Sequence, residues 1–159
     1  MDSKQVMFSL NKQIATVTRK LNEVTYNSIA AVIERIDEVS PVGDVRLWKH
    51  PNKAPKGYIG GQFRGNWQLG VDSKPTAYFI GKIDPSGVAT VSENIAKIPL
   101  AASRHQYFLI NNLPYAMALE EGHSTQSPPH AMMYRVKREF NGIVRKVVAD
   151  IKANGGRVK

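Results

Sequence analysis

The stretch FSLNKQIATVTRKLNEVTYNSIAAVIERIDEV, residues 8–39, decides the fold class of this chain. Its apolar side chains recur three or four positions apart, the spacing that places them on one side of an α-helix. A helix of this length spans roughly 45 Å, longer than a compact domain of this size requires. We therefore predict a long amphipathic helix, part of which packs against another subunit. The apolar stripe comprises Leu10, Ile14, Val17, Leu21, Val24, Ile29, Val32, Ile33 and Ile36.

The boundaries of this helix can also be read from the sequence. The apolar stripe shifts at residues 26–28, which indicates either a bend or two helices in succession. Ser40-Pro41 ends the pattern, because proline disfavours helical backbone in the residue before it and has no amide hydrogen. The following residues, 42–61, are rich in proline, glycine and lysine and predict a long extended loop. Loops of this length are usually functional, so the segment is a candidate contact region.

Three shorter segments carry the apolar patterns of β-strands. The first alternates between apolar and polar residues, and Gly65 interrupts the alternation, which predicts a bulge there. Asp84-Pro85-Ser86-Gly87 has the residue types of a tight turn. The predicted strands are residues 62–71, 77–83 and 106–111.

Three further segments are predicted to be helical. Residues 88–98 suit a strand or a helix, and the spacing of their apolar residues favours the helix. A short helix is expected at residues 115–121, where Gly122 stops it. The C-terminal helix is predicted to begin at Ser127-Pro128, with serine as the N-cap, and to end at Asn154.

The order helix, strands, helix predicts an α+β fold, in which a long N-terminal helix and a C-terminal helix pack on one face of a small, mostly antiparallel sheet. The length suits a single domain over residues 1–159, with an extended loop at 42–61 and a flexible tail at 155–159. There is no cysteine, which excludes disulfides, thiolate metal sites and cysteine nucleophiles. No apolar run approaches the ~20 residues that span a bilayer, so we expect synthesis in the cytoplasm and no membrane partner.

The net charge of +9 falls in two blocks. Residues 42–66 carry five basic side chains against Asp44, and residues 131–159 carry eight against two acidic ones. Such blocks indicate a polyanionic neighbour, DNA first, although they also suit a solvated surface that keeps a protein soluble. Trp48, in a loop with few apolar neighbours, is a candidate intersubunit anchor. The candidate DNA-facing or partner-facing cations are Arg46, Lys49, Lys53, Lys56 and Arg64.

No residue pattern points to catalysis. The four histidines lack partners at the spacing that would place two metal ligands on one helical face. Nucleophile-elbow, phosphate-loop and dinucleotide-binding motifs are absent. Glu120-Glu121-Gly122-His123 contains acid and base groups, but it reads more simply as a helix end that opens into a loop. We therefore predict no catalytic residue, no metal site and no cofactor, and we expect that the protein is not an enzyme.

Four segments resemble the pattern of tailed-bacteriophage tail-completion proteins, also called neck, minor tail or tail-terminator proteins. They are Pro41-Val42-Gly43-Asp44, Phe63-Arg64-Gly65-Asn66-Trp67, Asn111-Asn112-Leu113-Pro114-Tyr115-Ala116 and Leu119-Glu120-x-Gly122-x-Ser124-x-Gln126. In such families a long N-terminal helix ends at a P-V-D-T-G type segment, a strand with R-x-N-W character follows, and a final helix closes the domain. The motif residues are Phe63, Asn66, Trp67, Asn111, Asn112, Pro114, Tyr115, Glu120, Gly122, Ser124 and Gln126.

We expect structural roles for these motif residues. Asn111, Asn112 and Pro114 would set the geometry of a turn, and Tyr115 would pack against the core. The polar side chains of Glu120 and Gln126 would accept hydrogen bonds from loop amides. The alternation around Phe63 and Trp67 favours core packing for both rings over base stacking.

The resemblance implies a virion protein at the head–tail junction. Its subunits would form a homo-oligomeric ring, commonly sixfold, that completes or terminates the tail, contacts the tail tube protein and joins it to the head–tail connector protein. Genomic DNA would pass through the lumen without sequence-specific contacts. The alternative prediction is a sequence-independent DNA-binding accessory protein. An enzyme such as a nuclease ranks last, because clustered carboxylates that would hold two metal ions are missing.

Overall fold

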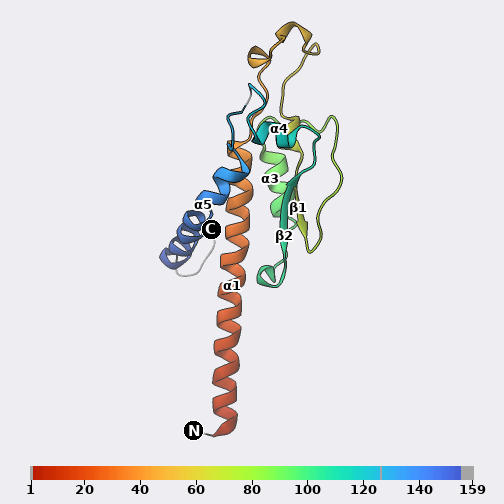
Figure 1. The fold of residues 1–159 in the computed structure, drawn as a ribbon. Helices are drawn as coiled ribbons and strands as arrows, with labels where there is room; N and C mark the ends of the chain where they lie inside the picture. The colour runs from red at the N-terminus through yellow and green to blue at the C-terminus, as the bar shows by residue number, and fades with distance from the viewer. Residues whose placement is uncertain (1, 126, 155–159) are drawn as a thin grey trace.

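A long helix runs through the whole height of the molecule. The computed structural model describes residues 2–125 and 127–154, and its first element is helix α1, Ser3–Val39 (Figure 1). α1 is a single helix of 37 residues, so the shift of the apolar stripe does not mark a second helix. It ends as predicted, because Ser40 is its extended C-cap and Pro41 follows.

A two-stranded antiparallel sheet packs beside the C-terminal half of α1. Strand β1, Trp67–Val71, pairs with strand β2, Tyr107–Asn111, with Leu69 opposite Leu109. Helix α5, Met133–Ala153, lies along the upper part of α1 and diverges from it toward its own C-terminus (Figure 1). The predicted α+β fold, with long N-terminal and C-terminal helices around a small antiparallel sheet, is confirmed.

The first predicted strand is shorter than expected. Residues Gln62–Gly65 form a single helical turn, α2, and the strand begins only at Trp67. The predicted bulge at Gly65 is wrong. The glycine is required there because a Cβ atom would collide with the carbonyl group of Lys82, which crosses directly over the turn.

The predicted strand at residues 77–83 is also wrong. Side-chain amides hydrogen-bond its backbone in place of a neighbouring strand. The Asn66 amide accepts from the Phe79 N–H at 2.7 Å and donates to the Phe79 carbonyl at 3.0 Å, while Gln68 donates to the Ala77 carbonyl at 2.7 Å. The segment therefore follows the body of the molecule as an irregular chain, and Ile80 is exposed.

The remaining helices agree with the sequence except at one boundary. Residues Val88–Ile95 form helix α3, and Ala116–Glu120 form the short helix α4. The 84–87 turn is confirmed, since the Gly87 amide donates to the Asp84 carbonyl at 3.3 Å. The prediction that the last helix starts at Ser127-Pro128 is wrong, because α5 begins at Met133. Three further 3₁₀ turns are Val45–Leu47 (η1), Pro51–Lys53 (η2) and Ala102–Arg104 (η3).

The core involves only the C-terminal half of α1. Among the described residues, the two buried clusters and the side chains packed on them take nothing from α1 before Tyr26. Residues 3–21 of the helix therefore protrude beyond the body of the molecule (Figure 1). The buried apolar residues are Ile33, Ile36, Phe63, Trp67, Leu69, Ile98, Ala102, Leu113, Leu119, Met132 and Val136.

An ion pair between α1 and α5 predicts a stability change in acid. Arg35 donates to both carboxylate oxygens of Glu139, at 2.7 and 3.1 Å, and this pairing lowers the pKa of Glu139 to about 2. The ionised form is thus favoured in the folded state, so the pair stabilises above the ordinary glutamate pKa of 4.5 and ceases to do so as pH falls toward about 2.

We expect Glu139→Gln to lower the unfolding free energy at neutral pH by less than about 1 kcal/mol, because the carboxylate is a third exposed and therefore screened. Urea denaturation of both proteins between neutral pH and pH ~2 checks this. The difference between them should shrink as the pH falls through this window. A difference that stays constant across the window would contradict the assignment.

Candidate functional site

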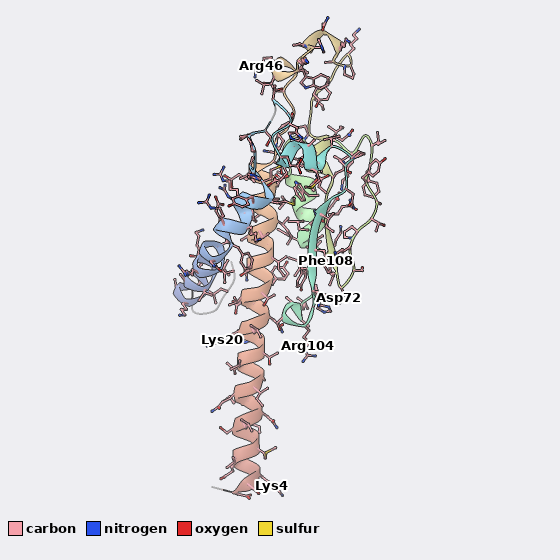
Figure 2. The ribbon with its side chains drawn as sticks, viewed as in Figure 1. Lys4, Lys20, Arg46, Asp72, Arg104 and Phe108 are labelled. Atoms are coloured by element: carbon pink, nitrogen blue, oxygen red, sulfur yellow. The ribbon has the colours of Figure 1, made fainter. Side chains whose placement is uncertain are left out.

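The protruding half of α1 carries the most extensive apolar surface that the sequence analysis anticipated. Its large apolar side chains are between 47% and 73% exposed. In Figure 2 the side chains between the labelled Lys4 and Lys20 stand out from the helix with no other element beside them. Single exposed apolar residues are common on proteins, but a continuous stripe marks a contact surface. These residues are Val6, Met7, Phe8, Leu10, Ile14, Val17 and Leu21.

The loop of residues 41–61 projects from the opposite end of α1 (Figure 1). Trp48 is half-buried against Tyr58, with ring centroids 5.0 Å apart in an edge-to-face arrangement. Thr125 donates a hydrogen bond from its hydroxyl group to the Leu47 carbonyl. Trp48 thus holds the loop together from within, and its role as an intersubunit anchor stays a prediction.

The base of this loop is held by backbone contacts. The Gly61 amide donates to the Val42 carbonyl at 2.6 Å, and the Gly61 carbonyl accepts from the Asp84 amide at 3.1 Å. Gly61 has a φ of 92°, and a Cβ atom there would collide with the backbone of Pro85. The close approach of three chain segments therefore requires glycine, and it anchors the loop to the body of the molecule.

Four of the five candidate cations lie on this loop. Lys49, Lys53 and Lys56 are exposed. Arg46 is also exposed, but its guanidinium pairs with the Asp44 carboxylate at 2.6 Å, and this hydrogen bond lowers the pKa of Asp44. The three lysines consequently supply the positive field of the loop.

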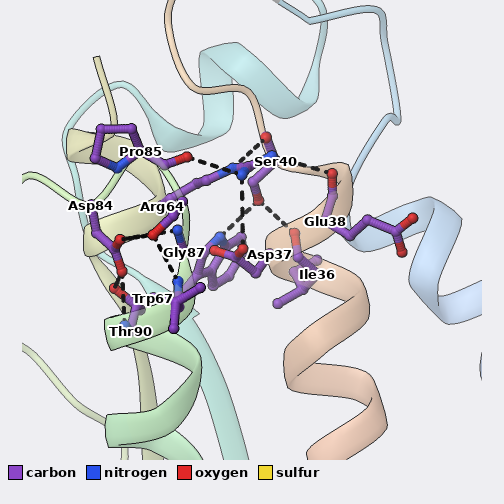
Figure 3. A network of polar contacts seen from close by, with 12 residues as sticks. Ile36, Asp37, Glu38, Ser40, Arg64, Trp67, Asp84, Pro85, Gly87 and Thr90 are labelled. Carbon is purple, nitrogen blue, oxygen red and sulfur yellow. Dashed lines mark hydrogen bonds and ion pairs between the residues drawn. The ribbon is translucent and has the colours of Figure 1, made fainter. Parts of the chain in front are cut away.

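Arg64 belongs to a different part of the structure. Its guanidinium donates to the carbonyls of Ser40 (3.0 Å), Pro85 (3.1 Å) and Glu38 (3.4 Å), as Figure 3 shows, and its side chain is 17% exposed. The last carbonyls of a helix lack intrahelical partners, so Arg64 caps the C-terminus of α1. The interpretation of Arg64 as a cation that faces DNA together with the loop residues is therefore corrected.

Asp37 lies against this guanidinium in a nearly dry environment. Its carboxylate is 4.0 Å from Arg64 Nη1, and one carboxylate oxygen has no hydrogen-bond partner among the described residues. Burial raises the pKa of Asp37, and the charge of Arg64 opposes that rise. Gly87 is adjacent, and a Cβ atom there would collide with the Asp37 carboxylate. The cluster joins α1 to the start of α3.

Trp67 connects β1 to the same helix end. Its indole N–H donates to the Ser40 hydroxyl at 2.9 Å, and this hydroxyl donates to the Ile36 carbonyl at 2.6 Å (Figure 3). Phe63 packs edge-to-face on the indole with ring centroids 5.7 Å apart, and both rings are buried. The prediction that Phe63 and Trp67 belong to the core is confirmed.

The asparagine pair after β2 binds backbone groups on both sides. Asn111 donates from its amide to the Phe63 carbonyl at 2.8 Å and accepts from the Leu113 N–H at 3.2 Å. Asn112 donates to the Pro75 carbonyl at 2.8 Å. The pair therefore ties the turn to neighbouring segments. Beyond it, Pro114 is exposed, and Tyr115 is 40% exposed with its ring 6.3 Å from that of Phe63.

Glu120 is a buried carboxylate at the start of α5. It is 6% exposed and accepts hydrogen bonds from the amides of Met132 (3.2 Å), Met133 (3.1 Å) and Tyr134 (3.0 Å). These are the first amides of the helix, which lack intrahelical partners, and a negative charge also suits the helix dipole there. Glu120 thus caps α5 from a distant position in the sequence.

The last motif residues border this cap. Gly122 follows α4 with a φ of 76°, where a Cβ atom would collide with Pro129. Ser124 forms a single antiparallel bridge with Ser127. Gln126, the other residue that we expected to accept from loop amides, lies outside the described residues, as does the predicted tail at 155–159.

Asn94 is a structural residue that the sequence analysis missed. It is 1% exposed, accepts from the Leu69 N–H at 2.8 Å and donates to the Trp67 carbonyl at 2.8 Å. It thereby pairs with the edge of β1 that faces away from β2. The available signal was a polar residue four positions after Thr90, on the inner side of the 88–98 helix.

The described residues do not assemble a recognisable catalytic or metal site. Within residues 2–125 and 127–154, there is no group of three histidine, aspartate or glutamate side chains placed to hold a metal ion. Over the same residues, no helix is both long and apolar enough to cross a membrane. The features available for function are therefore the two projecting surfaces at opposite ends of α1. No protein-family model, curated protein or solved structure matches this chain.

Proposed function

We propose that the protein is a non-enzymatic structural subunit of a tailed-bacteriophage virion, which assembles with copies of itself into a ring at the head–tail junction. The observation that carries the proposal is the exposed apolar stripe on the free half of α1. Burial of each such side chain contributes about 1.5–3 kcal/mol, so association is strongly favoured over permanent exposure. Closed rings are a common way in which copies of one chain cover such surfaces.

The two ends of α1 support a joining role. One end presents the apolar stripe, and the other presents the projecting loop with Lys49, Lys53 and Lys56. A subunit with separate contact surfaces at opposite ends is suited to link two assemblies, here the tail tube protein and the head–tail connector protein. The ring, commonly sixfold in the families that the motifs resemble, would complete the tail, and the loop lysines would face genomic DNA without reading its sequence.

A nonsense mutation in the gene tests this function. In a nonpermissive host, an amber mutation should yield filled heads together with tails that are unjoined or abnormally long, because the joining subunit is missing. Electron microscopy of the lysate gives the readout, and growth in a suppressor host is the control. Normal infectious particles from the nonpermissive host would rule the proposal out.

A second candidate, a sequence-independent DNA-binding accessory protein, is favoured by the exposed cations. Retention of duplex DNA by the purified protein, with steep salt dependence, would support it, and Lys49→Glu/Lys53→Glu/Lys56→Glu should reduce that dependence by about 0.9 in log–log slope per lost phosphate contact. Absence of retention at low salt would reject this candidate. Further exposed cations on α5 are Lys137, Arg138, Arg145, Lys146 and Lys152.

A further inference from the structure

The exposed stripe on α1 has the period of a coiled coil. Its side chains alternate at steps of three and four residues, which average 3.5 per turn. An isolated helix has 3.6 residues per turn, so a strict 3.5 repeat keeps its apolar seam straight only when another helix winds along it. In heptad notation, the a positions are Met7, Ile14 and Leu21, and the d positions are Leu10, Val17 and Val24.

The positions that flank this seam identify the kind of partner. In coiled coils the e and g positions select partners by charge. Here the flanks are Asn11 and Thr18 on one side and Gln13 and Lys20 on the other, so a single charged residue borders the seam between residues 11 and 20. A strongly acidic or basic foreign helix would find little to pair with. Two identical faces, in contrast, can meet without extended repulsion between like charges.

The seam also continues into a groove of the folded body. Leu21 and Val24 line one wall of an apolar groove of about 640 Å³, and Leu109 of β2 and Phe140 and Val144 of α5 line the others. A helix that follows the seam would therefore remain on apolar surface from the tip of α1 into the body. Phe140 is 47% exposed at this groove, so its ring is available to such a helix.

We propose that residues 6–24 of α1 are covered by the same segment of a second copy of this chain, in an intersubunit helical bundle. The inference rests on the self-assembly part of the proposed function and names its contact surface. It does not depend on a location in the virion. Seam contacts in a protein whose loss leaves infectious phage would remove the head–tail role and keep this inference, and a joining defect without seam contacts would do the reverse.

Charge placed in the seam tests the proposal on the full chain. Leu10→Asp/Val17→Asp should convert the assembled protein to a monomer, as measured by light scattering coupled to size-exclusion chromatography. Both side chains are exposed and lie outside the core clusters, so circular dichroism and thermal melting of the monomer should remain close to those of the parent body. The matched control, Ser9→Asp/Thr16→Asp, adds the same charge at exposed positions outside the seam and should assemble normally.

The absence of native cysteines permits a second test by cross-linking. Ile14→Cys and Val17→Cys proteins are oxidised separately and as a mixture. Disulfide dimers of either single variant indicate parallel helices, and dimers found only in the mixture indicate antiparallel ones; both results support the proposal. Thr16→Cys, outside the seam, should remain largely unlinked. A parent protein that is monomeric far above micromolar concentration, or seam cysteines that link no better than Thr16→Cys, would overturn it.

Discussion

Replacement of Trp67 by alanine is expected to lower the free energy of unfolding by about 3–5 kcal/mol, the range for truncation of a large buried aromatic residue. Trp67 is 3% exposed and packs in the core cluster with Ile36, Phe63 and Leu113. The change leaves a cavity between β1 and the end of α1. It also removes the indole N–H that donates to Ser40. The loop base and the helix end should therefore loosen together.

Urea denaturation followed by far-ultraviolet circular dichroism measures this effect. Trp67→Phe keeps most of the apolar volume and loses the hydrogen bond, so we expect a smaller loss. Trp48→Ala is the matched control, because it removes the second of the two tryptophans from the projecting loop and leaves the core intact. A loss for Trp67→Ala no greater than that for Trp48→Ala would contradict the core role.

Replacement of Glu120 by alanine is expected to destabilise the protein by about 3 kcal/mol. Three amides at the start of α5, those of Met132, Met133 and Tyr134, would lose a common acceptor in a buried site. Hydrogen bonds to a charged group contribute about 1.5–3 kcal/mol, and an unsatisfied buried donor costs a further fraction of that. α5 should fray first at its N-terminus and then lose its packing on α1.

Hydrogen exchange of these three amides separates the cap from a general loss of stability. Their exchange should accelerate more than that of Val136 and later α5 amides in Glu120→Ala. Glu121→Ala alters the neighbouring, exposed carboxylate and should change stability by less than about 0.5 kcal/mol. Equal effects of the two substitutions would show that Glu120 is not the cap of α5.

The long helices were predictable because their determinants are local. The spacing of apolar residues defined α1 and α5, and Ser40-Pro41 ended the first helix where the structure ends it. The start of α5 was predicted wrongly for a nonlocal reason. Its N-terminal amides are capped by Glu120, a residue beyond the intervening loop, so the local Ser127-Pro128 signal had no effect.

Segments that depend on a partner were the least predictable. Residues 77–83 have the composition of a strand, but a strand also needs a neighbour with free backbone groups. Here the amides of Asn66 and Gln68 take those hydrogen bonds, and no local pattern indicates that they will. Arg64 illustrates the same limit for charge, since its place in a basic block does not reveal the three carbonyls that hold it.

The sequence by itself determined that the chain has two amphipathic helices, a cysteine-free composition and two basic blocks, because periodicity and composition are local properties. Only the tertiary structure decided which part of each apolar stripe is covered. The sheet and α5 are long enough to cover the second half of α1, and the first half extends past them. Periodicity reports that one face of a helix avoids water. Which surface covers that face depends on how far the rest of the fold extends.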